Sequence, residues 1–270
     1  MKGLKNFLKG IAVGVATLVP GVSGGTMAII LGIYDDLIHA ISSFFKDWKK
    51  HTKLLLEIGF GGILGILLFS RLLENALNKY PHIMRFLFMG IIIGGLPLLY
   101  RKATASGKRD KKDFIFAILG FTMVLLLSAE PTVTTTMATS QGILSMVFLF
   151  IAGIVMAIAL VLPGISGSFM LLVLGLYNVT LNAINDLNIP FLIPFGLGIV
   201  VGTLATTKII ESFLQKHPNK AYMLIIGFVV GSLLPVFPGV PSTSQLIPSA
   251  MVFIIGFIMI FWLGKKGITD

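Results

Sequence analysis

Apolar residues form eight long runs along the chain, and short polar stretches separate them. Each run is long enough, or nearly long enough, to cross the roughly 30 Å hydrocarbon core of a bilayer as a helix. No stretch remains that could form a soluble domain. The pattern predicts an all-helical polytopic membrane protein with apolar segments near residues 10–34, 54–73, 83–100, 114–129, 142–177, 191–213, 221–237 and 247–264.

The last four apolar runs repeat features of the first four. Gly10, Pro20, Gly32 and Tyr34 recur 143 positions later, as Gly153, Pro163, Gly175 and Tyr177. After the charged loop near residues 46–53 the spacing shortens to 137, which aligns Gly65 with Gly202, Pro81 with Pro218, Gly90 with Gly227 and Gly94 with Gly231. Gly120 then matches Gly256. The sequence therefore predicts two repeats, over residues 1–129 and 142–270, within one membrane domain.

The first segment of each repeat is broken by a Pro-Gly pair. Ten residues separate Lys9 from Pro20, and nine separate Gly25 from Asp35, so each helical arm would rise only about 15 Å. We therefore expect re-entrant hairpins over about 10–45 and 142–186, each followed by three transmembrane helices. An odd number of crossings per repeat makes the second repeat inverted relative to the first. Two complete spans per hairpin would give the same sidedness, and the longer 142–177 segment leaves that open.

Composition and charge agree with this topology. The chain is 56% hydrophobic and 12% charged, with a mean hydropathy of +0.96, which excludes a water-soluble globule. The hairpin topology puts 18 of the 21 Lys and Arg residues on one side, whereas unbroken first segments would divide them almost evenly. The positive-inside rule thus predicts that both termini are cytoplasmic. Basic loops between apolar runs point to anionic lipids as partners and not to nucleic acid. There is no cysteine, which excludes disulfides.

The two broken segments carry the chemistry that stands out in the sequence. The first motif is Pro20-Gly21-Val22-Ser23-Gly24-Gly25-Thr26, and the second is Pro163-Gly164-Ile165-Ser166-Gly167-Ser168-Phe169. After a Pro-Gly turn, serine and glycine at the start of a returning helix offer a hydroxyl and unpaired N–H groups to an anion. We expect substrate contacts from Ser23, Gly24, Gly25, Thr26, Ser166, Gly167 and Ser168. The alternative is that both motifs are close-packed helix breaks with locally bonded serines.

Charged residues inside or beside the apolar runs are secondary candidates. Arg71, Arg85 and Lys208 are candidates for guiding or holding an anion, and Glu57, Glu74 and Glu211 for coupling to an ion. The pairs Arg71 with Glu74 and Lys208 with Glu211 stand at equivalent helix ends. The alternative for all of them is interfacial snorkelling. The sequence has no nucleophile and base set, no metal-ligand spacing and no cofactor motif, so it predicts neither an enzyme nor a cofactor.

The paired motifs resemble those of a known family. Residues 19–26, 162–169 and 174–177 are similar to the bacterial polyprenyl-phosphate transporter (PopT) family, formerly a domain of unknown function, over nearly the full chain. The chain differs from the expected pattern at Thr17 and Leu160. The resemblance implies a flippase of the bacterial cytoplasmic membrane that returns undecaprenyl phosphate, the carrier lipid of peptidoglycan synthesis, to the inner leaflet.

Two other functions remain open at this point. A secondary transporter of a small soluble anion would use the same anion site with a closed lateral wall. A membrane lipid phosphatase would need a convergent His, Asp and Arg cluster that the sequence does not suggest. The coupling ion and the oligomeric state, including a homo-oligomer, also stay open.

Overall fold

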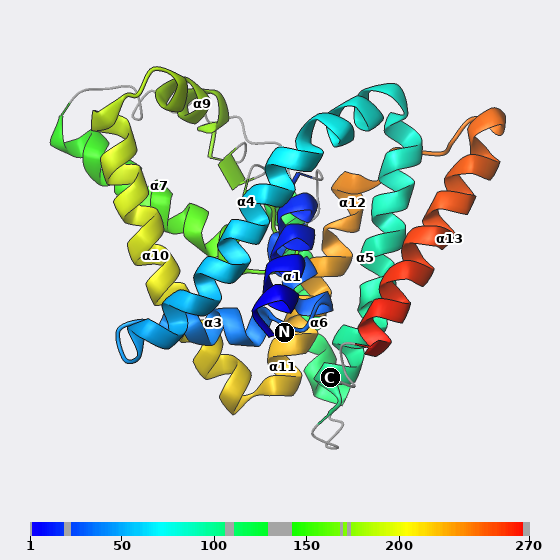
Figure 1. Cartoon of the computed structure of the whole chain (residues 1–270), viewed down its shortest axis with the longest axis horizontal. Helices are drawn as coiled ribbons and strands as arrows, with labels where there is room; N and C mark the ends of the chain where they lie inside the picture. Colours follow the sequence, from blue (N-terminus) through cyan, green and yellow to red (C-terminus); the bar gives the residue numbers. More distant parts are fainter. Residues whose placement is uncertain are drawn as a thin grey trace.

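The computed structural model describes residues 2–18, 23–105, 111–128, 142–167, 170–171 and 174–266 (Figure 1). This part of the chain is helical throughout, apart from turns and short connections. The first half contains α1 (Lys2–Thr17), α2 (Gly24–Ile30), α3 (Tyr34–Ser42), α4 (Trp48–Lys79), α5 (Pro81–Ala103), the 3-10 turn η1 (Lys111–Asp113) and α6 (Phe114–Ser128). The second half contains α7 (Ile143–Val161), α9 (Tyr177–Asn185), α10 (Ile189–Lys216), α11 (Pro218–Gly231), α12 (Leu233–Val236) and α13 (Thr243–Lys266).

The two halves pack by the same scheme. Within each half the first helix lies along the first long helix, α1 on α4 and α7 on α10. Between the halves, α5 packs on α13 and α6 packs on α11, while α5 and α11 meet at the centre. The predicted repeat therefore corresponds to a repeated set of helix contacts.

Glycines at matched positions make these close contacts possible. A β-carbon added to Gly10 of α1 would lie 2.3 Å from the carbonyl oxygen of Ile58, and one added to Gly153 of α7 would lie 2.2 Å from that of Phe195. A β-carbon added to Gly90 would likewise lie 2.1 Å from a backbone oxygen of α13, and one added to Gly227 would lie 2.1 Å from a backbone oxygen of α6. Small residues let helix backbones approach closely inside a membrane, so the glycine pattern is explained by packing.

Equivalent helices run in opposite directions in Figure 1. α4 rises from the lower left to the upper right, whereas α10 descends; α5 descends, whereas α11 rises. α3 lies at the lower end of the molecule and α9 at the upper end. The start of α1 and the end of α13 lie at the same, lower end.

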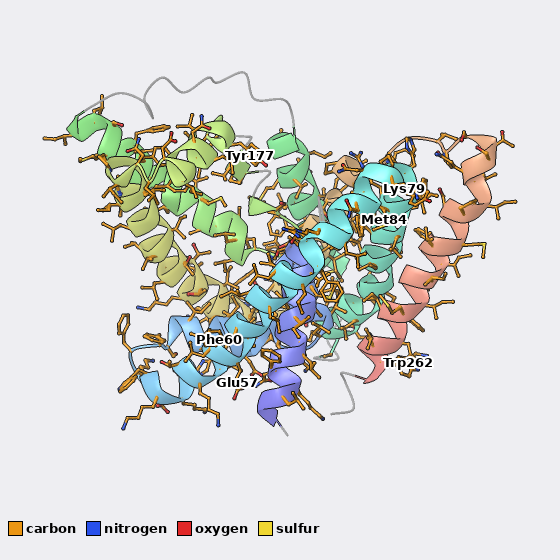
Figure 2. All side chains as sticks on the ribbon, turned by 45° about the horizontal axis from the view of Figure 1, so that its top comes forward. Glu57, Phe60, Lys79, Met84, Tyr177 and Trp262 are labelled. Carbon is orange, nitrogen blue, oxygen red and sulfur yellow. The ribbon has the colours of Figure 1, made fainter. Side chains whose placement is uncertain are left out.

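Six helices of the described chain are long and apolar enough to cross a membrane, namely α4, α5, α7, α10, α13 and the continuous α11–α12 stretch Pro218–Val236. Large apolar side chains such as Phe60 and Trp262 cover the outside of these helices, as expected for a surface in contact with lipid (Figure 2). The chain is therefore a multi-pass membrane protein, as the apolar runs predicted.

The hairpin arms are longer than the sequence suggested. α1 has 16 residues and α7 has 19, so they rise about 24 and 28 Å at ~1.5 Å per residue. α1 begins among the lysines before the apolar run, because basic side chains can snorkel from a helix that continues into the interface. α7 is long enough to be a complete span. The returning arm is broken, since α2 and α3 are inclined at 118°.

The break between α2 and α3 has a local cause. Gly32 adopts a left-handed conformation with φ +69°, and its repeat partner Gly175 has φ +67°. Glycine takes this conformation at little steric cost and commonly ends a helix. Gly32 therefore explains why α2 ends and the chain turns into α3, and Gly175 has the same conformation just before α9.

Candidate functional site

The two motifs contact each other directly. The backbone N–H of Gly164 donates a hydrogen bond to Thr26 Oγ1 at 2.9 Å. A β-carbon added to Gly25 would lie 3.3 Å from the α-carbon of Pro163. Thr26 is buried by this contact and does not line the cavity described next. Residues that are 138 positions apart in the sequence are thus hydrogen-bonded, and each motif supports the other.

A cavity of about 520 Å³ lies beside this junction and is lined by both motifs. The first motif contributes Ser23, Gly24 and Gly25, and the second contributes Ser166 and Gly167. The two positions at which the chain differs from the family pattern, Thr17 and Leu160, also line it. The remaining lining residues are Val13, Ala28, Tyr34, Leu37, Ile38, Ile41, Met156, Val161, Ile165 and Thr203.

The first motif is ordered by its own serine. The Ser23 hydroxyl oxygen accepts a hydrogen bond from the Gly25 N–H at 3.2 Å and so caps α2. Both central glycines are close to the preceding helix: a β-carbon at Gly24 would lie 2.9 Å from Thr17 Cγ2, and one at Gly167 would lie 2.7 Å from Met156 Cε. The two motifs therefore have matching surroundings. Pro20 to Val22, Ser168 and Phe169 lie outside the described residues.

The lining of the cavity is mostly apolar, and the polar groups within it are uncharged. Its described residues include the hydroxyl groups of Ser23, Ser166, Thr17, Thr203 and Tyr34, together with glycine backbone, but no Lys, Arg, His, Asp or Glu. Because α2 has only seven residues, its dipole is small, and hydroxyl and backbone donors are the main polar groups. Such a cavity can bind a compact anion only through neutral hydrogen-bond donors.

The charged candidates from the sequence lie elsewhere. Arg71, Arg85 and Lys208 are exposed on α4, α5 and α10, and none of them lines this cavity. Glu57 accepts a hydrogen bond from Asn6 Nδ2 at 2.8 Å, which joins α4 to α1. The side chain of Glu74 lies outside the described part of the chain. Their suggested roles in substrate guidance or ion coupling stay predictions.

Glu211 has different partners from those suggested by its spacing to Lys208. Its carboxylate lies 2.5 Å from His39 Nδ1 and accepts a hydrogen bond from the hydroxyl of Ser42. Both partners are on α3, so Glu211 joins α10 of the second half to the hairpin of the first. The i,i+3 spacing could not indicate these partners, because they lie about 170 residues away in the chain.

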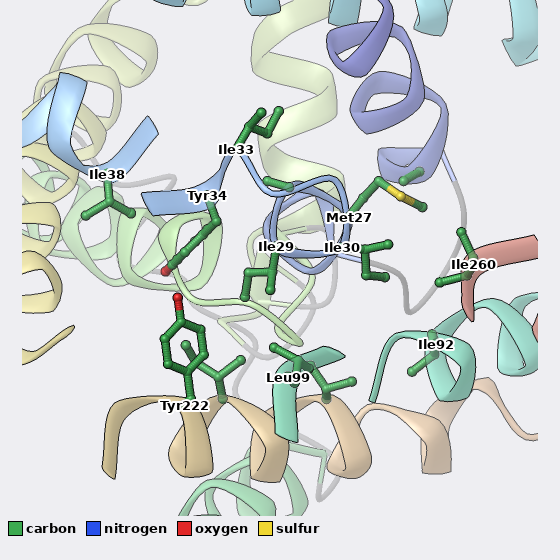
Figure 3. Close-up of a cluster of buried hydrophobic side chains, with 14 of the residues drawn as sticks. Met27, Ile29, Ile30, Ile33, Tyr34, Ile38, Ile92, Leu99, Tyr222 and Ile260 are labelled. Atoms are coloured by element: carbon green, nitrogen blue, oxygen red, sulfur yellow. The ribbon is translucent and has the colours of Figure 1, made fainter. Parts of the chain in front are cut away.

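The sequence also missed a network of polar side chains at the base of the hairpin. Tyr222 of α11 donates to the Asp35 carboxylate at 2.8 Å, and Lys102 of α5 binds the same carboxylate at 2.8 Å. The Tyr34 hydroxyl donates to the carbonyl oxygen of Val161 at 3.0 Å. Figure 3 shows the hydroxyl groups of Tyr34 and Tyr222 directed toward each other within the buried core. The repeat of Tyr34 as Tyr177 was the one available signal, and it did not reveal these partners.

Comparison with known proteins agrees with the resemblance seen in the motifs. A family described as undecaprenyl phosphate translocase-like matches residues 13–252. The chain is similar to proteins named polyprenyl-phosphate transporter from Staphylococcus aureus, with 38% identity over 96% of this chain and 95% of that protein, and from Vibrio cholerae, with 31% identity over 93% and 82%. No solved structure matches. The prediction of a transporter and not an enzyme is confirmed by these matches, and the chain belongs to the undecaprenyl phosphate translocase-like family.

Proposed function

We propose that this protein moves a polyprenyl phosphate, such as undecaprenyl phosphate, across the bacterial cytoplasmic membrane for recycling of the carrier lipid. The observation that carries the proposal is that one cavity is lined by Ser23 and Gly24 of the first motif and by Ser166 and Gly167 of the second. The names of the relatives in Staphylococcus aureus and Vibrio cholerae support the substrate class.

The phosphate would occupy this cavity and the polyprenyl chain would remain in lipid. Serine hydroxyls and glycine N–H groups are suitable donors for a phosphate monoester, since hydrogen bonds to an ionised acceptor are short and strong. Thr203 of α10 offers a further hydroxyl group, whereas the Tyr34 hydroxyl already donates to the carbonyl oxygen of Val161. A long apolar tail cannot fit in about 520 Å³ together with the headgroup, so it must leave through a lateral opening.

We also propose that the two halves are inverted repeats and that both termini are cytoplasmic. The opposite directions of α4 and α10, and the positions of α3 and α9 at opposite ends of the molecule, support this relation (Figure 1). The basic residues that flank α1 and α13 lie at one end, as the positive-inside rule requires for a cytoplasmic face. Movement of the halves would then expose the cavity to each side in turn.

Transport can be measured with the purified protein in liposomes that contain polyprenyl phosphate in both leaflets. A phosphatase added outside should release about half of the phosphate from protein-free vesicles and nearly all of it once the protein is present, because only headgroups that reach the outer leaflet are cleaved. An excess of the neutral polyprenol should not slow this release, since a site of hydrogen-bond donors recognises the phosphate. Inorganic phosphate trapped inside should stay there.

Two results would contradict the proposal. If polyprenol slowed transport as strongly as the phosphate ester does, the apolar tail would dominate recognition. If trapped inorganic phosphate escaped while the lipid did not cross, the protein would be a transporter of a soluble anion.

A further inference from the structure

α3 of the first half lies against the lower end of α10 of the second half (Figure 1). α3 supplies Tyr34, Leu37, Ile38 and Ile41 to the cavity lining, and α10 supplies Thr203. The contact between these two helices therefore forms the wall of the cavity toward the end of the molecule where α1 begins.

Polar groups at the outer edge of this contact hold the two helices together. Glu211 of α10 binds the imidazole of His39 and the hydroxyl of Ser42, and it also accepts a hydrogen bond from Gln215 Nε2 at 3.2 Å. The His39 ring in turn lies edge-on to His51 of α4, with ring centroids 5.4 Å apart. The His39 side chain is 54% exposed and that of Glu211 is 18% exposed. Water can therefore replace these hydrogen bonds, so the contact can open without leaving a buried unpaired charge.

The equivalent contact in the other half is absent from the described structure. In the repeat, α9 corresponds to α3 and α4 corresponds to α10. However, α9 does not pack along α4 as α3 packs along α10. Figure 2 shows Tyr177, at the start of α9, well separated from Lys79, at the end of α4. A fold with two similar halves thus has one of two equivalent contacts closed and the other open.

The sequence nevertheless contains residues that could form the missing contact between α9 and α4. Asn182 and Asn185 of α9 stand at the positions of His39 and Ser42, and Glu74 of α4 stands at the position of Glu211. Carboxamide N–H groups can donate to a carboxylate as the serine hydroxyl does. Both ends of the molecule therefore have the residue types needed for a hydrogen-bonded contact.

We propose that the α3–α10 contact is a closed gate, and that α9 closes on α4 through Asn182 and Glu74 when the α3–α10 gate opens. This inference rests on the proposed transport function. With the termini cytoplasmic, the structure is the state in which the cavity is closed toward the cytoplasm. Alternating access requires that the two gates close in turn, because the cavity must never be open to both sides.

Two pairs of engineered cysteines test the gates separately, since the natural chain has no cysteine. The pair Ser42→Cys with Glu211→Cys should form a disulfide readily with an oxidant, and transport should fall to the level of protein-free vesicles until a reductant restores it. The pair Asn182→Cys with Glu74→Cys should also form a disulfide, more slowly, because its closed state is less populated in the resting protein. That disulfide should stop transport as well. Each single-cysteine variant, treated in the same way, should transport at the same rate before and after oxidation, which separates the effect of the disulfide from that of the substitution.

The gate proposal would be overturned if the Asn182 and Glu74 pair never cross-linked in a transport-active protein. It would equally be overturned if the oxidised Ser42 and Glu211 pair transported at the rate of the reduced protein. Should that pair fail to fold, His39→Cys with Gln215→Cys joins the same two helices at more exposed positions. Cross-linking is read from gel mobility without any lipid substrate, so a wrong substrate assignment would leave this result unchanged.

Discussion

Replacing Gly24 or Gly167 with leucine is expected to reduce polyprenyl-phosphate transport about 100-fold while the protein still inserts and can be purified. A leucine at either position would occupy the cavity and separate the phosphate from the donors of both motifs. Losing one or two hydrogen bonds to a charged group costs about 3 kcal/mol, and every 1.4 kcal/mol is about tenfold. The phosphatase-coupled liposome assay measures the loss directly.

The steric surroundings of these glycines support this expectation. A β-carbon at Gly167 would meet the flexible ends of Met156 and Leu160, which can move aside. A β-carbon at Gly24 would lie 2.9 Å from Cγ2 of the stiffer, β-branched Thr17, so the fold accommodates Gly167→Leu more readily than Gly24→Leu. Gly59→Leu is the matched control, since a β-carbon there has nothing within 4 Å. Ser23→Ala and Ser166→Ala should have smaller effects, because each removes a single hydroxyl contact that contributes about 1 kcal/mol.

The combination of the two leucine changes distinguishes one shared site from two separate ones. Because both glycines border the same cavity, the double variant should be little worse than either single variant, as coupled residues are not additive. If both single leucine variants transported normally, the motifs would be packing elements, and the phosphate site would have to be sought near Arg71, Arg85 and Lys208.

Gly164→Ala is expected to cause the largest loss of stability among substitutions in the motifs. Gly164 has φ +84°, and a β-carbon would lie 2.6 Å from the backbone carbon of Phe228 in α11. The left-handed conformation alone costs an alanine about 1–2 kcal/mol. The clash with a helix backbone adds to this, because neither element can yield without moving the second motif away from α11. The midpoint temperature of thermal unfolding, measured on the detergent-solubilised protein, should decrease clearly.

Gly239→Ala separates the two contributions. Gly239 has φ +88°, but nothing lies within 4 Å of an added β-carbon. This variant should therefore show only the loss of stability caused by the left-handed backbone conformation. It should unfold at a temperature between those of the natural protein and Gly164→Ala. Equal losses for the two variants would mean that the approach of the second motif to α11 contributes nothing to stability.

The sequence predicted the membrane-spanning helices because they depend on local patterns of apolar residues. Apolar runs located the transmembrane helices, and recurring glycines such as Gly10 and Gly153 turned out to lie at equivalent helix contacts. The ends of the hairpin arms were less predictable. Hydropathy records where apolar residues stop, whereas α1 continues through Lys5 and Lys9 because a helix can carry snorkelling lysines into the interface.

Contacts across the two halves could not be derived from the sequence. The bonds of Asp35 to Tyr222 and of Glu211 to His39 join residues more than 170 positions apart, and no spacing rule connects them. The motifs themselves were recognisable, because helix breaks inside apolar segments are rare and usually functional. Their direct contact through Thr26 and Gly164 depends on how the halves dock, which only the three-dimensional structure describes.

The central claim is that the phosphate of the lipid lies in the cavity between the motifs, and protection of a cysteine inside that cavity tests it most directly. Thr203 lines the cavity from α10 and belongs to neither motif. In a Thr203→Cys variant, polyprenyl phosphate should slow reaction with a small water-soluble thiol reagent, whereas polyprenol should not. A cysteine at the exposed Lys50, outside the cavity, should react equally fast with or without the lipid. Equal protection by polyprenol, or no protection by polyprenyl phosphate at concentrations that support transport, would contradict the placement of the phosphate between the two motifs.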